Sequence, residues 1–272
     1  MSTPAKDIAG AARALREAAR TGQFIAPLRE TFPHMTAADA YAVQRANAEH
    51  RVREQGRRVL GCKIGLTAKA VQAQLGVDQP DFGMLFDDMG FGDAEPVPMQ
   101  GLHQPRIEAE VAFVLGRDLD LPNPGHVDVI KAIDHLLPAL EIVGSRIADW
   151  NIRFVDSVAD NASSGAYVLG STPRRLCDVD LTLCGMAMTR RGEPVSVGAG
   201  AACLGNPLNA VVWLARTMAS LGHPLRAGDL LLSGALGPMV AVKAGDVVEA
   251  RVNGLGSVKA VFEAEPTKES LS

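Results

Sequence analysis

The sequence predicts an α+β fold, in which a helical N-terminal region packs on a β-rich core to form one structural domain. Residues 5–56 carry apolar side chains at helical spacing, whereas from residue 59 onward short apolar runs alternate with glycine and proline. The helical region is therefore expected to span residues 1–58 and the β-rich core residues 59–265, with a tail at residues 266–272.

The N-terminal region is expected to hold two helices joined by a connector. The first has apolar side chains at helical spacing between Ile8 and Ala18 and is broken at Thr21-Gly22. The second begins with Thr36 as its N-cap, because a threonine side chain can accept a hydrogen bond from the first turn of a helix. No chemical signature appears here, which predicts a packing or clamping role.

Within the core, apolar runs predict strands, and helical spacing after a capping residue predicts helices. Strands are expected at residues 59–66, 106–115, 138–144, 230–234, 240–242, 247–252 and 258–262. Helices are expected at residues 67–75, 127–137 and 206–222, the last with Asn206 as N-cap before Pro207. A loop rich in turn residues is expected at residues 76–83.

Composition and charge exclude several classes of function. The chain has 272 residues, of which 47% are hydrophobic, and a formal net charge of −4 with no long run of one sign. This distribution offers no electrostatic footprint for nucleic acid or for an anionic membrane. The polar N-terminus and the absence of a long apolar run predict a cytoplasmic protein.

The cysteines lack the spacing of a metal or redox motif. Cys62, Cys177, Cys184 and Cys203 form no Cys-x-x-Cys pair and have no histidine nearby. We expect small buried hydrophobic side chains rather than zinc ligands or disulfides.

The predicted strand at residues 106–115 places two carboxylates on one face. Because side chains alternate along a strand, Glu108 and Glu110 lie together, opposite a wholly apolar face. Their own face turns apolar again at Ala112 and Val114, so the pair is expected at the edge of a buried surface. Two carboxylates about 7 Å apart repel each other there and need a cation or a basic partner.

Two other charged residues stand alone within apolar runs. Lys63 is typical of a lysine whose stem packs while its ammonium reaches water, or of a positive charge directed into a site. Glu141, taken alone, is typical of a surface strand position. Three glutamates on two apolar strands are better explained by convergence on a common cation, since an unpaired buried carboxylate is costly.

Two segments rich in turn residues hold the remaining polar candidates. Asp78 and Asp81 lie in the predicted loop, where ordinary turn positions explain both of them. Asp160, Asn161 and Ser163 belong to a cluster of small polar residues before a strand. Such a cluster is either a simple turn or a site that binds a carboxylate or a carbonyl.

A site of three glutamates without histidine or cysteine offers only oxygen ligands, which suit Mg²⁺ or Mn²⁺. Such a cation, with open positions, can chelate a 2-oxo acid and stabilise the enolate formed when a proton leaves C3. Lys63 and the aspartates of the loop are then the candidates for charge stabilisation and proton transfer.

Six segments of the sequence resemble the 2-keto-4-pentenoate hydratase family of the fumarylacetoacetate hydrolase superfamily. They are GCKIGLT (61–67), GVDQPDFG (76–83), QPRIEAE (104–110), PALEIVGSR (138–146), DSVADNAS (156–163) and GNPLNA (205–210). They follow the family's order over nearly the whole chain. The resemblance implies a mixed β-sandwich roll with flanking helices, and a homo-oligomer such as a pentamer or a decamer.

The resemblance also implies roles for the residues singled out above. Those that correspond to ligands of a divalent metal are Glu108, Glu110 and Glu141. Those that match proton-transfer residues are Lys63 and Asp81. Those expected in the substrate site are Ser163, by its match to a substrate-site residue, with Asp160 and Asn161 beside it.

We therefore predict a metal-dependent hydro-lyase that adds water to 2-hydroxypenta-2,4-dienoate and gives 4-hydroxy-2-oxopentanoate, in meta-cleavage breakdown of aromatic compounds. The dienol would ketonise by protonation at C5, and water would then add at C4. The first alternative is a 4-oxalocrotonate-type decarboxylase with the same metal site, which would release carbon dioxide. A C–C hydrolase of acylpyruvates is disfavoured, because the sequence shows no obvious histidine beside an acid to activate a nucleophilic water. The non-enzyme alternative is a metal-stabilised accessory subunit.

Overall fold

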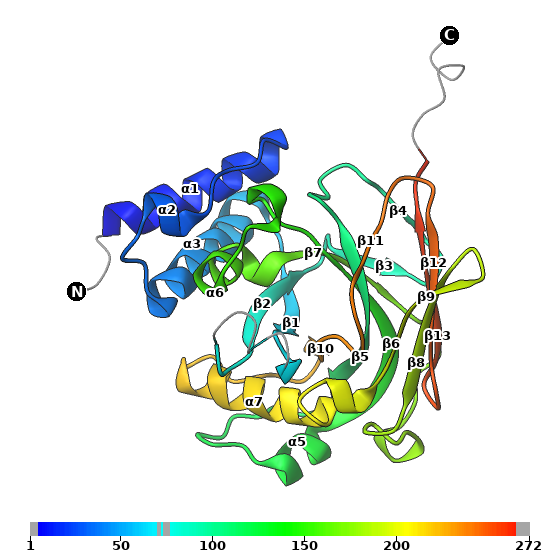
Figure 1. Cartoon of the computed structure of the whole chain (residues 1–272). Helices are drawn as coiled ribbons and strands as arrows, with labels where there is room; N and C mark the ends of the chain where they lie inside the picture. Colours follow the sequence, from blue (N-terminus) through cyan, green and yellow to red (C-terminus); the bar gives the residue numbers. More distant parts are fainter. Residues whose placement is uncertain (1–4, 70–71, 73–76, 265–272) are drawn as a thin grey trace.

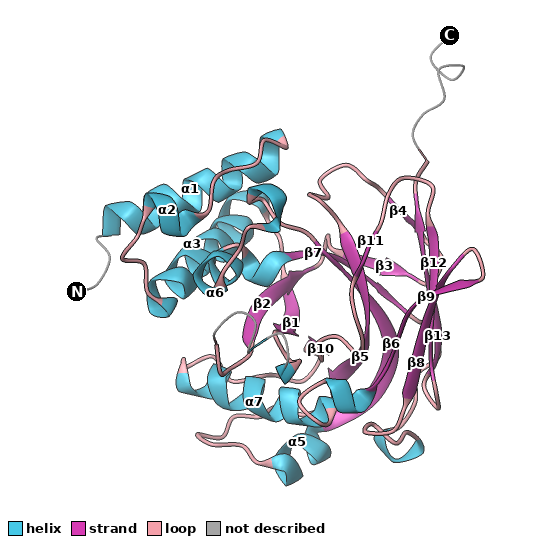
Figure 2. Cartoon of the chain, viewed as in Figure 1, coloured by secondary structure: helices cyan, strands magenta, loops and turns pink. Residues whose placement is uncertain are grey.

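The computed structural model describes residues 5–69, 72 and 77–264, and Figure 1 shows how they are arranged. The helices gather in two groups beside the strands (Figure 2). One group contains α1 (Ala5–Thr21), α2 (Leu28–Thr31), α3 (Ala37–Gln55) and α6 (Phe154–Ala159). The other contains α5 (His126–Ala132) and α7 (Pro207–Ser220). Short 3-10 turns are η1 (Ala148–Trp150), η2 (Asn161–Ser163), η3 (Leu176–Asp178) and η4 (Gly200–Ala202).

The strands of the described residues form a larger and a smaller sheet. The larger has the order β2-β1-β10-β5-β6-β7-β3, with β11 paired to β5. Its strands are β1 (Val59–Gly65), β2 (Asp81–Phe86), β3 (Gly90–Gly92), β5 (Arg106–Leu115), β6 (Ile133–Val143), β7 (Ser164–Leu169), β10 (Leu230–Leu232) and β11 (Val240–Ala241). The smaller has the order β4-β13-β12-β8-β9. Its strands are β4 (Pro96–Val97), β8 (Gly185–Arg190), β9 (Glu193–Ala199), β12 (Val247–Val252) and β13 (Gly256–Phe262).

The main hydrophobic core lies between the two sheets, where β6 packs against β12 and β13. The alternating face of β5 contributes Ile107, Ala109, Val111 and Phe113, all of them buried. Each sheet combines parallel and antiparallel pairs, as β1 pairs with β10 in parallel and with β2 in antiparallel orientation. The mixed sheets with flanking helices confirm the predicted α+β fold class.

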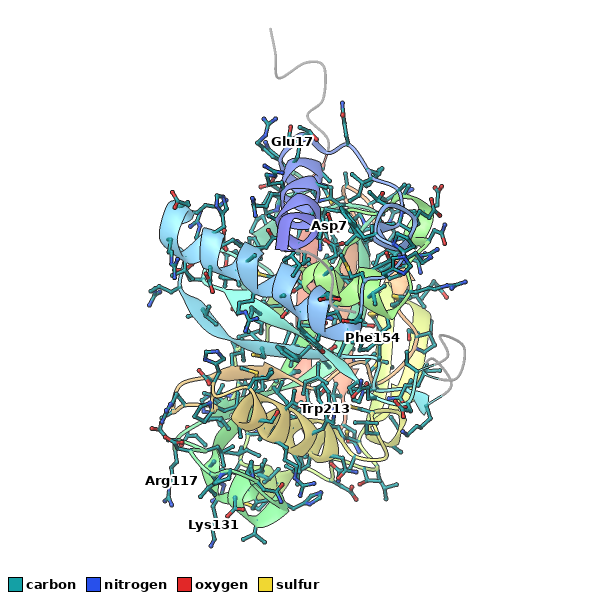
Figure 3. The ribbon with its side chains drawn as sticks, turned by 90° about the vertical axis from the view of Figure 1, so that its left-hand side faces the viewer. Asp7, Glu17, Arg117, Lys131, Phe154 and Trp213 are labelled. Carbon is teal, nitrogen blue, oxygen red and sulfur yellow. The ribbon has the colours of Figure 1, made fainter. Side chains whose placement is uncertain are left out.

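The N-terminal helices form their own small core with α6. Ala11 and Leu15 of α1, Val43 of α3 and Val158 of α6 are buried there. The predicted N-cap of α3 is confirmed, since Thr36 Oγ accepts a hydrogen bond from the Asp39 backbone N–H. Figure 3 shows α1 at one end of the molecule and α5 at the other. The boundary at residue 58 stays a prediction.

The predicted helix at residues 127–137 is wrong beyond Ala132, where α5 ends. Its apolar residues suit a helix and a strand alike, and pairing with β5 decides between them. Leu136 lies opposite Phe113, so the segment from Ile133 onward obtains its backbone hydrogen bonds from the sheet. The loop predicted at residues 76–83 is likewise too long, because β2 already begins at Asp81.

The cysteines follow the prediction with one exception, and two predicted segments fall mostly or wholly outside the described residues. Cys62, Cys184 and Cys203 are buried as predicted, but Cys177 is exposed in η3. The predicted helix at residues 67–75 lies mostly, and the tail at residues 266–272 wholly, outside the described residues. No helix in the described part of the chain is both long and apolar enough to cross a membrane.

Candidate metal centre

Strand register gathers the predicted glutamates at one point of the larger sheet. Glu108 of β5 lies directly opposite Glu141 of β6, and Glu110 follows two positions along β5. Directly paired residues, and residues two apart in a strand, project from the same face of a sheet. One carboxylate oxygen from each of the three glutamates therefore lies within 4.8 Å of the other two.

Glu110 and Glu141 are fully buried, Glu108 is half-buried, and several of their carboxylate oxygens lack hydrogen-bond partners. Glu110 Oε2 accepts a hydrogen bond of 2.9 Å from the Gly234 backbone N–H, while Glu110 Oε1 and both oxygens of Glu141 have no hydrogen-bond partner. Burial, followed by repulsion from neighbouring carboxylates, raises the pKa of Glu108 to about 7 and raises the pKa of Glu110. Burial also raises the pKa of Glu141, against the opposing charge of Lys63. Three such carboxylates fit a hard divalent cation, which prefers oxygen ligands and would relieve the repulsion.

Lys63 reaches the same carboxylates from another part of the larger sheet. Its Nζ lies 3.2 Å from Glu141 Oε1 in an ion pair outside hydrogen-bond geometry, and its side chain is 3% exposed. Because β10 and β5 separate β1 from β6, and neighbouring strands lie about 4.8 Å apart, the sheet must curve around the site. Burial lowers the pKa of Lys63, but the facing carboxylates outweigh it, so the net shift is upward and the ammonium is charged. Lys63 is therefore a charge directed into the site.

The side chains of Asp81 and Lys63 both lie next to Gly65. Ser157 Oγ of α6 donates a hydrogen bond of 2.8 Å to Asp81 Oδ2, while the buried Asp81 Oδ1 has no hydrogen-bond partner. Gly65 lies opposite Asp81 in the β1–β2 pairing, and a Cβ there would be 2.3 Å from Asp81 Oδ1 and 3.5 Å from Lys63 Nζ. Burial raises the pKa of Asp81, and the Lys63 charge and the Ser157 hydrogen bond oppose that rise. Gly65 thus leaves room for both polar groups.

The turn before β7 carries the predicted substrate-site residues and packs against β1 and β2. Residues 161–163 all have φ between 51° and 56°, a left-handed conformation that is costly for residues with a Cβ. Arg146 fixes the start of this turn, because its Nε and its backbone N–H bind the two carboxylate oxygens of Asp160. The carboxylate of Asp160 is therefore engaged within the protein.

The rest of the turn is tied to β2. The Asn161 side-chain amide accepts from the Met84 backbone N–H and donates to the Met84 carbonyl, at 2.8 and 2.9 Å. The Ser163 hydroxyl, by contrast, is buried without a hydrogen-bond partner. Of the three predicted residues, only Ser163 keeps its side-chain oxygen free for a ligand.

Sequence reasoning missed several residues that position this site. A glycine inside a strand often marks a close approach, so Gly65, two residues after a lone lysine, carried a signal that was not used. Ser157 and Arg146 lie in segments that carry the family resemblance, but no pattern assigned a role to either. Ser157 and Asp81 are separated by 76 positions, which no local spacing rule can bridge.

Several known proteins are similar to this chain in sequence and architecture. A family model described as fumarylacetoacetate (FAA) hydrolase C-terminal matches residues 40–263. The chain is 66% identical over 254 residues to the 2-keto-4-pentenoate hydratase of Paraburkholderia xenovorans (strain LB400), covering 93% of this chain and 94% of that protein. Among solved structures, 4-oxalocrotonate decarboxylase from Pseudomonas putida G7, complexed with magnesium and adipate, has a TM-score of 0.91 and 37% identity, covering 96% of this chain and 100% of that one. The same enzyme complexed with calcium and acetate has a TM-score of 0.90 and 37% identity, covering 96% and 99% of the two chains.

Proposed function

The chain belongs to the fumarylacetoacetate hydrolase family, and we propose that within it the protein is a hydratase of 2-hydroxypenta-2,4-dienoate, also called 2-keto-4-pentenoate. The product would be 4-hydroxy-2-oxopentanoate, in the meta-cleavage breakdown of aromatic compounds. One observation carries this proposal: a three-glutamate cluster, two of its members fully buried, faces a charged lysine in a chain 66% identical to a 2-keto-4-pentenoate hydratase.

We propose Glu108, Glu110 and Glu141 as the ligands of a divalent cation, Mg²⁺ first and Mn²⁺ second. The support is a donor set made only of carboxylate oxygens, several of them without hydrogen-bond partners. A 37% identical relative is known in complex with magnesium, and also with calcium. When bound, such an ion supplies positive charge to the carboxylate and C2 oxygen of a 2-oxo acid.

Lys63 and Asp81 are our candidates for the chemical steps that the chain itself performs. The Lys63 ammonium, buried and charged, would stabilise the negative charge that develops on the C2 oxygen when water adds at C4. Asp81 would exchange protons through Oδ1, the oxygen that Ser157 leaves free. In the overall balance, the enol proton moves to C5, and the added water leaves its hydroxyl at C4 and a proton at C3.

The turn at residues 160–163 would hold the substrate. We propose that the free hydroxyl of Ser163 hydrogen-bonds a carboxylate or carbonyl oxygen of the substrate. Asp160 and Asn161 would serve the same site indirectly, since their side chains hold the left-handed turn through Arg146 and Met84. This arrangement presents a rigid donor rather than a flexible one.

A decarboxylase is the second candidate, because the fold matches 4-oxalocrotonate decarboxylase with a TM-score of 0.91. The identity to that enzyme is 37%, against 66% to the hydratase, and this difference favours hydration. A non-catalytic accessory subunit has no similar support, since the curated relatives are hydratases.

One assay separates these functions. The purified chain is mixed with the dienol, with Mg²⁺ or with a chelator, and ultraviolet absorbance and product mass are recorded. A hydratase consumes the dienol only with the cation and yields a product heavier by one water. Release of carbon dioxide from 4-oxalocrotonate without hydration of the dienol would instead identify a decarboxylase. If the dienol stays unchanged and 4-oxalocrotonate releases no carbon dioxide, with Mg²⁺ or with the chelator, only the accessory role is left.

We also propose a homo-oligomer, a pentamer or a decamer in keeping with the family resemblance. The edge strand β9 of the smaller sheet exposes Val197 at 65%, and Leu183, in the turn before β8, is 72% exposed. Exposed apolar side chains near a free strand edge are suited to contact another subunit. Sedimentation velocity on the wild type and on Leu183→Glu tests this assembly. The cytoplasmic location stays a prediction.

A further inference from the structure

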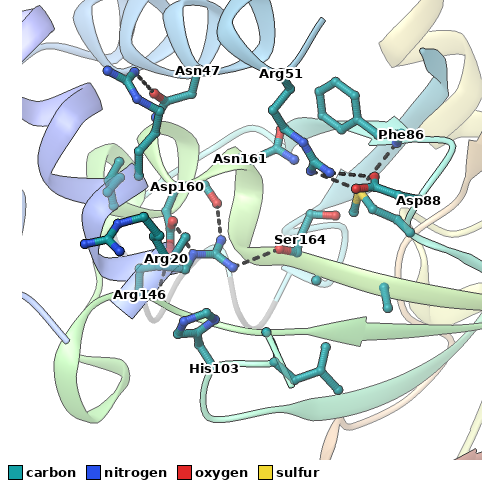
Figure 4. Close-up of a pocket in the computed structure, with 18 of the residues that line it drawn as sticks. Arg20, Asn47, Arg51, Phe86, Asp88, His103, Arg146, Asp160, Asn161 and Ser164 are labelled. Carbon is teal, nitrogen blue, oxygen red and sulfur yellow. Dashed lines mark hydrogen bonds and ion pairs between the residues drawn. The ribbon is translucent and has the colours of Figure 1, made fainter. Parts of the chain in front are cut away.

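A cavity of about 510 Å³ lies between the N-terminal helices and the larger sheet (Figure 4). Side chains of α1 and α3 line one side of it, and residues of β2, β3 and β7 with the segment 97–103 line the other. Its volume is in the range of small-molecule sites. Among the described residues, its lining includes neither the three glutamates nor Lys63 nor Asp81, so the cavity is separate from the metal centre.

Two buried side chains offer unused hydrogen-bonding atoms to this cavity. His103 is 6% exposed and Ser164 is 5% exposed, and both line the cavity. Neither His103 Nδ1 nor Ser164 Oγ has a hydrogen-bond partner among the described residues. Buried polar atoms in folded proteins are nearly always paired, so two unpaired atoms in one cavity indicate a polar ligand. Burial lowers the pKa of His103, which makes its imidazole a neutral partner.

The lining of the cavity carries positive charge, and Arg16 is the arginine in it without a carboxylate partner among the described residues, since Arg20 pairs with Glu17. The lining acids are already neutralised, as Asp88 pairs with Arg51 at 2.5 Å and Asp160 with Arg146 at 2.6 Å. Arg16 of α1 donates a hydrogen bond of 2.6 Å to the Asn47 amide oxygen, which orients its guanidinium without neutralising it. Within the described part of the chain, Arg16 has no carboxylate partner. A single free guanidinium suits one carboxylate, which it can bind with two parallel hydrogen bonds.

We propose that this cavity binds a small organic acid with one carboxylate and one hydroxyl or carbonyl group. The carboxylate binds Arg16, and the second group binds His103 and Ser164. The lining of the cavity includes Asp160 and Asn161 of the turn that holds Ser163, so a bound acid would contact the outer side of that turn. The proposal concerns binding alone and does not depend on the reaction at the metal centre.

Calorimetric titration of the full-length chain with 4-hydroxybutyrate and 6-hydroxyhexanoate tests the site. Butyrate lacks the hydroxyl group, and 1,4-butanediol lacks the carboxylate. We expect saturable binding of at least one hydroxy acid, weaker binding of butyrate and none of the diol. The affinity should be equal with Mg²⁺ and with a chelator, whereas an acid bound at the metal centre would require the cation. Failure of the hydratase assay would leave this result unaffected.

Arg16→Gln should weaken binding about tenfold or more, because it removes a charge-assisted pair, and Ser164→Ala should weaken it about threefold to tenfold. Arg13→Gln is the matched control: it removes the same charge from an exposed residue of α1 that does not line the cavity. Circular dichroism verifies that each variant is folded. Equal losses in Arg16→Gln and Arg13→Gln, absence of saturable binding, or binding of inorganic phosphate in place of the acids would overturn the proposal.

Discussion

Ser157 and Asp81 share a buried hydrogen bond of 2.8 Å that determines which oxygen of the aspartate faces the site. The bond occupies Asp81 Oδ2 and leaves Oδ1 without a hydrogen-bond partner. The helix that carries Ser157 is itself held in place, because the neighbouring Asp156 is fully buried and forms an ion pair with Arg29. Ser157 therefore acts as a positioning residue for Asp81.

Ser157→Ala should lower kcat by about tenfold or more while KM changes little, because Asp81 loses its fixed orientation. The lost hydrogen bond lowers the pKa of Asp81 in the wild type, so the limb of the pH–rate profile that reports Asp81 should move to higher pH. Steady-state kinetics across the pH range measure both effects. Ser157→Thr, which keeps the hydroxyl, should restore most of the activity. An unchanged kcat with an unchanged profile would show that Ser157 only packs.

Gly65→Ala should abolish most of the activity, by about 100-fold, because the new Cβ would lie 2.3 Å from Asp81 Oδ1 and must displace it. Gly185→Ala is the matched control, since a Cβ added at this strand glycine would meet no heavy atom within 4 Å. Hydratase rates of both variants measure the loss of activity, and their thermal unfolding midpoints show whether either variant is destabilised. Similar activities for the two variants would contradict the close packing at Gly65.

Glu110→Gln should have opposite effects on the metal-free and metal-loaded protein. Without metal, removing the buried Glu110 carboxylate from three that repel one another should raise the unfolding midpoint by about 2–5 °C. The Gln amide oxygen can still accept the hydrogen bond from the Gly234 N–H. The affinity for Mg²⁺ should fall by about 100-fold, so added Mg²⁺ should stabilise the variant much less.

Differential scanning fluorimetry with Mg²⁺ and with a chelator measures both effects of Glu110→Gln. The exposed Glu193→Gln on β9 loses the same charge far from the cluster in the chain and should behave as the wild type. A midpoint that falls without metal, or one that rises equally with Mg²⁺ in both variants, would argue against a carboxylate cation site.

The metal-free protein should become less stable as the pH rises from 5 to 8. An acid whose pKa is raised by folding binds its proton more tightly in the folded chain, so the free energy of unfolding falls with increasing pH. For Glu108 this fall begins near 4.5 and ends above about 7. Its size is on the order of 3 kcal/mol for a shift from 4.5 to about 7.

Urea unfolding in chelator at several pH values tests this dependence. Glu108→Gln removes the titrating group, so its curve should be flatter than that of the wild type over the same interval. Saturating Mg²⁺ should also flatten the wild-type curve, because the carboxylates then stay ionised. Parallel curves for wild type and variant would mean that Glu108 does not titrate in this interval.

The individual strands of the site could be predicted from the sequence, but their register could not. The strict alternation around Glu108 and Glu110 identifies one face of β5 without any knowledge of the fold. Whether Glu141 joins that face depends on its pairing with Glu108, and a shift of one residue would turn it to the opposite face. The cost of unpaired buried carboxylates indicated that the three glutamates converge, and the family resemblance implied the same, but neither of them supplied the register.

Periodicity failed where one apolar pattern suits two structures. The spacing from Val129 to Leu137 fits a helix, yet from Ile133 onward it is a strand, because β5 offers hydrogen bonds there. The burial of Lys63 was similarly undecided, since a long side chain can either reach water or turn inward. The carboxylates that draw it inward come from distant parts of the chain, and local sequence carries no information about them.

β10 separates β1 from β5, and Leu231 pairs with Cys62 on one side and with Phe113 on the other. A strand from the last part of the polypeptide therefore joins the strand of Lys63 to the strands of the glutamates. The ribosome releases the N-terminal end first, so a nascent chain carries all four charged residues long before residues 230–232 have been made. The lysine and the acids of this protein can therefore be joined through this sheet only after residues 230–232 have been made.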